Sequence, residues 1–237
     1  MRARLESLYF GPAGGQYPRL ARVLSLTARR FCPDWDVTVR RIPPHHIQAA
    51  SGSDADAANH YKLAEWTRLA CVAPDGSRLL LVDADTFVAA PLDPLWERDF
   101  DVAYTARPQG SRFPLNAGVV ALRVGPRARE FMLAWLGTDA AFLADTTARG
   151  PWRRTHGGQN QASLGFVLGA ASVKVLALPC AEWNCEDTTW AKFGPGTRIV
   201  HVKSALRMCA FGIGPSAPGV RNLARMWRDL DAEAATL

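Results

Sequence analysis

The stretch RLLLVDADTFV, residues 78–88, decides the fold of this chain, because two carboxylates follow directly after an apolar run. Four aliphatic residues at 79–82 follow a turn signal at 74–77, and they predict a strand that is buried on both faces of a parallel sheet. Burying an unpaired carboxylate is costly, so Asp83 and Asp85 are expected at the carboxyl end of this strand, where open α/β sheets bind ligands. Residues two apart in an extended chain point the same way, which aims both carboxylates at one spot. The alternative is a strand that simply runs into an Asp-rich turn.

Composition places the chain among globular α/β domains. Its 237 residues are 48% hydrophobic, which is enough to bury a full core, and we expect a single domain over residues 1–237. The net charge of +6 comes from arginines scattered along the chain, without a lysine-rich tail or a repeated aromatic and basic pattern. This distribution argues against a nucleic-acid partner and fits anionic ligands, such as a nucleotide or a phospholipid surface.

The apolar runs and the cysteines indicate in which cellular compartment the protein is expected. No run approaches the roughly 18 apolar residues of a membrane span, and residues 1–10 lack the apolar core of a signal peptide, so we expect a cytoplasmic protein. The five cysteines are odd in number and sit mostly in apolar settings, which suits reduced thiols. Cys180 and Cys185 lack a second cysteine pair, which argues against a zinc site. The adjacent His45 and His46 are assigned no role.

Hydrophobic periodicity predicts strands and helices that alternate along the chain. The segment 138–152 is less regular, and we interpret it as a surface segment. The glycine-rich turn at 11–15 follows the first strand without the spacing G-x-G-x-x-G, so a phosphate cradle and a plain loop are equal alternatives. The expected strands cover 5–10, 35–42, 79–82, 101–105, 116–123, 173–178 and 198–203, and the expected helices cover 17–31, 58–72, 126–136 and 159–168.

Polar residues stand at the ends of several of these elements. Asn116-Ala117-Gly118 opens an apolar strand, where the glycine lets a ligand approach the backbone and the amide can bind a sugar hydroxyl. The amides of Gln159-Asn160-Gln161 open a helix and exceed what a cap requires. Lys62 and Arg68 lie off the buried face of their helix, so each can reach a phosphate or simply be solvated. His201 in the last strand is a structural residue unless other ligands converge on it.

Taken together, these motifs resemble the GT-A glycosyltransferases, and within them the family-8 type that includes glycogenin and the bacterial lipopolysaccharide galactosyltransferases. The matching motifs stretch from Tyr17 to Arg207, which is most of the chain. Residues 80–86 are similar to the D-x-D of that family, 116–119 to its N-[AS]-G-V segment, and 201–207 to its closing H-x-x-G-x-x-K. The resemblance implies a Rossmann-like fold with a mixed, mostly parallel sheet flanked by helices.

The resemblance also implies a metal site made by Asp83, Asp85 and His201. Breaking a sugar–diphosphate bond leaves negative charge on the nucleotide, and a divalent cation absorbs that charge. Two carboxylates and an imidazole suit Mn²⁺, with Mg²⁺ as the alternative ion.

Donor binding is likewise implied by the resemblance. We expect a UDP-sugar held between the turn at 11–17 and the strand that ends at Asp83. Tyr17 either stacks on the base or is simply the first apolar residue of its helix. The expected donor-binding residues are Tyr17, Lys62, Arg68, Asp83, Ala84, Asn116, Ala117, Gly118, Lys203 and Arg207.

Three positions depart from the family pattern. Asn160 replaces an acid, Ser204 replaces a glycine and Arg207 replaces a lysine. Arg207 can still hold phosphate, and does so bidentately. The catalytic residues that the resemblance implies are Gln161, Asn160 and Asp85. An amide is a poor nucleophile, so we expect a front-face, retaining reaction in which Gln161 orients the sugar, although the charge lost at Asn160 leaves the stereochemical outcome open.

The sequence thus predicts a metal-dependent enzyme that transfers a sugar from a nucleotide diphosphate sugar to a saccharide acceptor. A catalytically inactive relative that binds nucleotide sugars or carbohydrates is an alternative because of Asn160 and Ser204. A sugar-phosphate nucleotidyltransferase shares the fold but would want a G-x-G-x-R turn near the start. A haloacid dehalogenase phosphatase would need threonine where Phe87 stands.

A basic amphipathic helix is predicted near the end of the chain, at about 220–233. Such a helix either docks on the core or lies on an anionic membrane surface, and the second alternative would suit an acceptor on a lipid-linked glycan precursor. Its apolar face consists of Val220, Leu223, Trp227 and Leu230, flanked by Arg221, Arg225 and Arg228.

Overall fold

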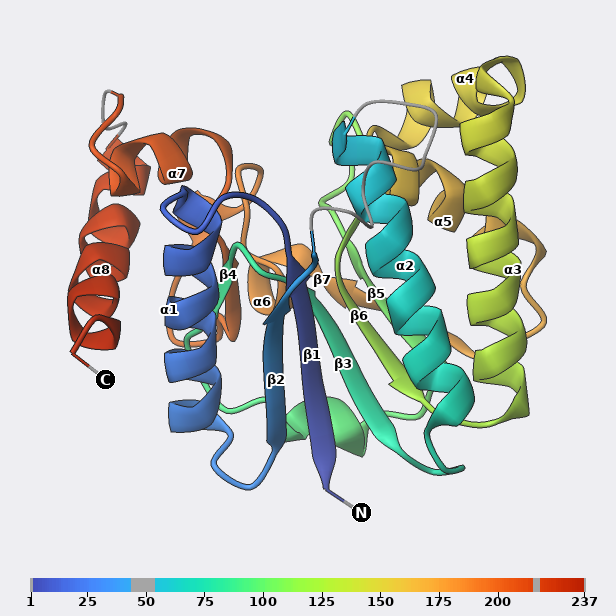
Figure 1. The fold of residues 1–237 in the computed structure, drawn as a ribbon, viewed down its shortest axis with the longest axis horizontal. Helices are drawn as coiled ribbons and strands as arrows, with labels where there is room; N and C mark the ends of the chain where they lie inside the picture. The colour runs from blue at the N-terminus through green and yellow to red at the C-terminus, as the bar shows by residue number, and fades with distance from the viewer. Residues whose placement is uncertain (1, 44–53, 215–217, 237) are drawn as a thin grey trace.

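A six-stranded sheet runs through the middle of the molecule, with helices on both of its faces (Figure 1). The computed structural model describes residues 2–43, 54–214 and 218–236, so His45 and His46 lie outside the described residues. The strand order is β2-β1-β3-β6-β5-β7, and β6 is antiparallel to both of its neighbours while the other pairings are parallel. The mixed, mostly parallel sheet is therefore confirmed. The strands are β1 (Ala3–Tyr9), β2 (Asp36–Arg41), β3 (Arg78–Asp83), β5 (Val102–Ala106), β6 (Leu115–Arg123) and β7 (Val175–Pro179).

The helices form two layers around this sheet. In Figure 1, α1 and α8 stand on the left of the sheet and α2 and α3 on the right. The helices are α1 (Gln16–Phe31), α2 (Asp54–Val72), α3 (Pro126–Ala144), α4 (Thr146–His156), α5 (Gln159–Ala170), α6 (Cys180–Trp183), α7 (Ser204–Ala210) and α8 (Pro218–Ala234), with short 3-10 turns η2 (Asp93–Glu97) and η3 (Trp190–Lys192).

The prediction of an irregular surface segment at 138–152 is wrong. Helix α3 continues to Ala144, and α4 follows after a single residue. That residue, Asp145, caps α4, because its carboxylate accepts hydrogen bonds from the backbone N–H groups of Thr147 (2.8 Å) and Ala148 (3.1 Å). A side-chain cap thus starts a helix that shows no apolar periodicity.

Strand β3 is buried on both faces, as its aliphatic run predicts. Leu80 and Val82 pack in the cluster on the α1 side, whereas Leu79 and Leu81 pack in the cluster under α2 and α3. All four side chains are almost completely buried. Because no polar side chain is accommodated within this run, the first carboxylate appears where the strand ends.

A second, two-stranded sheet joins distant parts of the sequence. Strand β4 (Thr86–Val88) pairs antiparallel with β8 (Ile199–His201), and Thr86 lies opposite His201. The N–H of Val88 donates to the Thr27 hydroxyl of α1 (3.1 Å), which ties this small sheet to the main domain.

The last helix uses its apolar face for packing. Leu223 and Trp227 of α8 are buried in a cluster shared with α1, α7 and β8, and Arg19 of α1 pairs with Asp231 (2.5 Å). The docked alternative for this helix therefore describes the structure. Among the described residues, no helix is both long enough and apolar enough to cross a membrane. None of the five cysteines forms a disulfide in the structure.

We predict that Trp227→Ala lowers the free energy of unfolding by about 3–5 kcal/mol, because it empties a fully buried indole site between α8, α1 and α7. Urea denaturation followed by circular dichroism measures this. The neighbouring Met226 is 38% exposed, so Met226→Ala is the control and should change little. Equal, small effects of both substitutions would contradict the docked position of α8.

Candidate metal and nucleotide site

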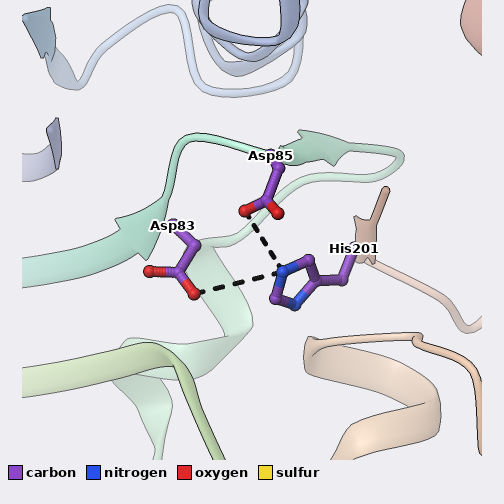
Figure 2. A group of neighbouring side chains, drawn as sticks. All are labelled: Asp83, Asp85 and His201. Carbon is purple, nitrogen blue, oxygen red and sulfur yellow. Dashed lines mark ion pairs between the residues drawn. The ribbon is translucent and has the colours of Figure 1, made fainter. Parts of the chain in front are cut away.

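Three ionisable side chains meet where β3 and β8 end and β4 begins. Figure 2 shows Asp83 and Asp85 turned toward the imidazole of His201. Nε2 of His201 lies 3.2 Å from Oδ1 of Asp85 and 4.0 Å from Oδ2 of Asp83, and one ligand atom from each residue falls within 4.8 Å of the others. The structure thus brings together the residues that the family resemblance assigned to a metal.

Backbone pairing produces this meeting. Asp83 is the last residue of β3, and Asp85 stands directly before β4. Next to the β4–β8 ladder, the N–H of Val202 donates to the carbonyl oxygen of Asp85 (2.6 Å), and the N–H of His201 donates to that of Cys185 (2.8 Å). Main-chain hydrogen bonds therefore hold the histidine beside the carboxylates.

A chain of hydrogen bonds fixes the tautomer of His201. The carbonyl oxygen of Asn116 can only accept, so the Thr105 hydroxyl donates to it (2.7 Å) and in turn accepts from the side-chain N–H of Asn184 (2.9 Å). The Asn184 side-chain oxygen then faces Nδ1 of His201 (3.1 Å), which must carry a proton. Nε2 is thereby the nitrogen that faces the carboxylates and can bind a metal.

The residues present fit a divalent cation. Mn²⁺ readily binds both carboxylates and imidazoles, whereas Mg²⁺ prefers the carboxylate oxygens. Gly118 provides room at the cluster, because a Cβ there would lie 2.9 Å from Oδ2 of Asp83, from Oδ1 of Asn116 and from Cε1 of His201. A side chain at this position would force Asp83, Asn116 or His201 to shift.

Two cations offset the charges of the two carboxylates. The Lys62 ammonium forms an ion pair with Asp83, and the Arg207 guanidinium forms one with Asp85. Burial alone would raise the pKa of Asp85, but His201, Arg207 and Lys62 hold that pKa well below its ordinary value. A metal on Nε2 would require a neutral imidazole, and the charges of Asp83, Asp85, Lys62 and Arg207 then sum to zero.

A pocket of about 150 Å³ opens beside these charges, between the ends of β1 and β3 and the first turns of α1 and α2. Tyr17 stands in its wall, stacked on Phe10 at 5.5 Å between ring centroids. The Tyr17 hydroxyl accepts a hydrogen bond from Arg207 (3.3 Å), which connects the wall to the carboxylates. Of the residues expected to bind the donor, the pocket is lined by Tyr17, Lys62, Asp83 and Ala84, and Asp85 lines it as well.

Other expected donor residues lie elsewhere. Arg68 is exposed on α2 and pairs with Glu65 (3.3 Å), so it does not reach the carboxylates as Lys62 does. Lys203 pairs with Glu186 (2.5 Å) and Asp187 (3.2 Å). Ala117 is buried in the core beneath α2 and α3.

The amides expected to act in catalysis sit at the start of α5. The side-chain N–H of Asn160 donates to the carbonyl oxygen of Asn59 (3.0 Å), a residue that lines the pocket, and Oδ1 of Asn160 is buried without a hydrogen-bond partner in the described chain. The side-chain N–H of Gln161 donates to the carbonyl oxygen of His156 (2.6 Å). Asn160 therefore contacts a residue of the pocket wall, whereas Gln161 contacts the end of α4.

Ser204 stands where the family motif suggested by the sequence has a glycine. It has φ +47°, a left-handed value that favours glycine, and among the described non-glycine residues it is alone in having a positive φ. This conformation follows His201 by three residues and starts α7, which brings Arg207 to Asp85. Ser204 therefore has a backbone conformation that glycine adopts more readily.

The sequence analysis missed Asn184 and Thr105. From the sequence, Asn184 is assigned no role, and Thr105 is included only as the last residue of the strand expected at 101–105. Neither belongs to a local pattern, because their hydrogen-bond partners lie far away in the sequence. No sequence signal that we know of distinguishes them.

Comparison with known proteins identifies the fold. No protein-family model matches the sequence, and no curated protein does. Among solved structures, the chain is similar to a glycosyltransferase involved in glycosylation of the major capsid of PBCV-1 (14% identity, 98% of this chain and 99% of that one, TM-score 0.61). It is also similar to the galactosyltransferase LgtC in complex with donor and acceptor sugar analogs (14% identity, 96% of this chain and 96% of that one, TM-score 0.57). A third similar structure is the glycosyltransferase GlyE of Streptococcus pneumoniae TIGR4 (14% identity, 100% of this chain and 64% of that one, TM-score 0.62). These likenesses show that the chain has the GT-A fold.

We predict that Gly118→Ala weakens Mn²⁺ binding by roughly 10–100-fold, because the added methyl displaces Asp83 and His201 from their positions. Calorimetric titration with MnCl₂ measures this. Gly125 has open space around its Cβ position and extended backbone, so Gly125→Ala is the matched control and should bind as the wild type does. Unchanged affinity in Gly118→Ala would show that the cation binds elsewhere.

Proposed function

We propose that the chain is a metal-dependent glycosyltransferase that moves a sugar from a UDP-sugar to a saccharide acceptor with retention of configuration. The observation that carries this proposal is the meeting of Asp83, Asp85 and His201 at the end of β3 in a GT-A fold. Open α/β sheets bind ligands at that edge, and the pocket lined by Tyr17 and Lys62 opens beside Asp83 and Asp85.

The charges of the cluster support a diphosphate donor. Lys62 and Arg207 offset Asp83 and Asp85, so a bound divalent cation would leave a net charge of about +2. A nucleotide diphosphate sugar carries about two negative charges on its diphosphate, which matches that value. Complementarity of this kind favours a diphosphate ester over a neutral ligand.

The residues divide the work of the reaction. Asp83, Asp85 and His201 hold the cation, and when bound it stabilises the negative charge that develops on the leaving diphosphate. Lys62 and Arg207 can exchange their carboxylate partners for phosphate oxygens, and Arg207 presents two N–H groups for this. Their positive charge is already in place before the donor arrives, so little reorganisation is required.

The transfer step exchanges one bond at the anomeric carbon for another. The bond from this carbon to the diphosphate oxygen breaks, the bond to the acceptor hydroxyl oxygen forms on the same face, and the hydroxyl proton passes to the leaving diphosphate. Gln161 orients the sugar in this proposal. Both Gln161 and the preceding Asn160 are amides, and amides are poor nucleophiles. A front-face reaction, which needs no nucleophilic side chain, is therefore favoured over a covalent intermediate.

In this proposal, the pyrimidine base of the donor nucleotide binds in the pocket beside Tyr17. Tyr17 and Phe10 form one aromatic wall, against which a pyrimidine such as uracil can stack. Contact with a membrane is not part of this proposal, because the apolar face of α8 is packed on the core.

We predict that UDP binds in the presence of Mn²⁺ at least tenfold more tightly than GDP, CDP or ADP, and that Asp85→Ala abolishes this binding without unfolding the protein. Calorimetry with and without EDTA measures the affinities, and circular dichroism reports the fold. Asp99 is an exposed acid, so Asp99→Ala is the control and should bind normally.

Two outcomes would contradict this assignment. Tighter binding of GDP or ADP would exclude the uridine donor, and binding of UDP that survives both EDTA and Asp85→Ala would exclude the metal site. Hydrolysis of UDP-sugars that depends on Mn²⁺ then separates a transferase from an inactive binding protein.

A further inference from the structure

An open hollow lined by arginines lies on α4 and on the loop before β6. Helix α4 stands at the upper right of Figure 1. The hollow has a volume of about 540 Å³, and the side chains that form it include Arg112, Phe113, Arg149, Arg153 and Arg154. None of the described residues that line it is acidic.

Among the described residues, a single carboxylate pairs with the arginines of this hollow. Arg149 and Arg153 share the single carboxylate of Asp56, at 3.5 and 3.4 Å. Arg112 and Arg154 form no ion pair with any residue that the structure describes. Four guanidinium groups and one carboxylate leave a charge of about +3, and like charges gathered on one face destabilise a helix unless an anion offsets them.

An aromatic ring forms part of the same hollow. Phe113 lies beneath Arg112, whose guanidinium carbon is 5.0 Å from the ring centroid, and Arg107 approaches the same ring at 5.9 Å. The ring offers an apolar surface for the face of a sugar, and the guanidinium groups offer paired N–H donors for an oxyanion. A solvated basic surface would require no such combination.

The hollow adjoins the residue assigned to orient the donor sugar. A Cβ at Gly157 would lie 3.2 Å from the Phe113 ring and 3.1 Å from the side-chain nitrogen of Gln161. Gly157 has φ +90°, a conformation that favours glycine, and because it has no side chain it leaves room for both Phe113 and Gln161. From Phe113 the chain reaches Gly118 at the metal cluster in five residue steps, a span of at most about 17 Å.

We propose that this hollow binds the acceptor and that the acceptor is an anionic saccharide, one that carries a phosphate or a carboxylate group. The role of this saccharide as an acceptor rests on the proposed function, whereas its binding to the hollow can be measured without turnover. The anionic group pairs with Arg112 and Arg154, and the sugar ring packs on Phe113. A hydroxyl of the same saccharide then reaches the reaction centre beside Gln161, while the anionic group is left unchanged.

Calorimetry of the full chain with glucose 6-phosphate, glucuronate and glucose tests the proposal, without added metal so that the carboxylate cluster does not take up phosphate through a cation. We expect the two anionic sugars to bind at least tenfold more tightly than glucose, with an affinity that falls as salt is added. Arg112→Gln combined with Arg154→Gln should remove this preference. The control, Arg127→Gln combined with Arg225→Gln, removes the same charge from exposed positions of α3 and α8 and should retain the preference.

Glucose that binds as tightly as the anionic sugars, or a preference that survives Arg112→Gln with Arg154→Gln, would overturn the inference. The same holds if a single-stranded oligonucleotide binds these arginines more tightly than either sugar does. Hydrolysis of UDP-sugars by wild-type protein is measured alongside. Its absence would refute the proposed function while the binding result stands, and its presence without an anionic preference would refute only the acceptor.

Discussion

The antiparallel pairing of β4 with β8 is the constraint on which the site depends. Asp83 and Asp85 stand at the end of β3 and just after it, but His201, the third side chain of the cluster, comes from a segment far along the sequence. Pairing of Thr86 with His201, extended by the hydrogen bond from Val202 to Asp85, sets the backbone of that segment against the turn. Asn184 then sets the ring orientation, so the site is positioned by main-chain bonds first and by side chains second.

Charge balance explains how two carboxylates stand together at a partly buried edge. Desolvation of Asp83 and Asp85 is offset by Lys62 from α2 and Arg207 from α7, so elements on both sides of the sheet contribute one cation each. The groups that stabilise the cluster without ligand are the ones proposed to meet the diphosphate. The arginine hollow is a separate positive region on α4, and its Phe113 lies with Gln161 around Gly157.

Much of the fold follows from local sequence, and the parts that do not have physical reasons. The aliphatic run of β3 and the carboxylates after it were predicted because a strand buried on both faces excludes charge. Helix α4 was not predicted, because its one buried side chain is His156 and it has no apolar stripe to detect. The roles of Thr105 and Asn184 exist only through tertiary contacts, and the position of Lys203 against Glu186 depends on a buried acid that no local pattern reveals.

The central claim is that Asp83, Asp85 and His201 hold one metal ion against a nucleotide diphosphate. Anomalous diffraction at the manganese edge, from crystals grown with Mn²⁺ and UDP, tests it most directly. The account predicts a single strong peak about 2.0–2.3 Å from ligand atoms of all three side chains, with diphosphate density on the side of Lys62 and Arg207. A peak that lies outside this cluster, or UDP density with no peak between the three residues, would contradict it.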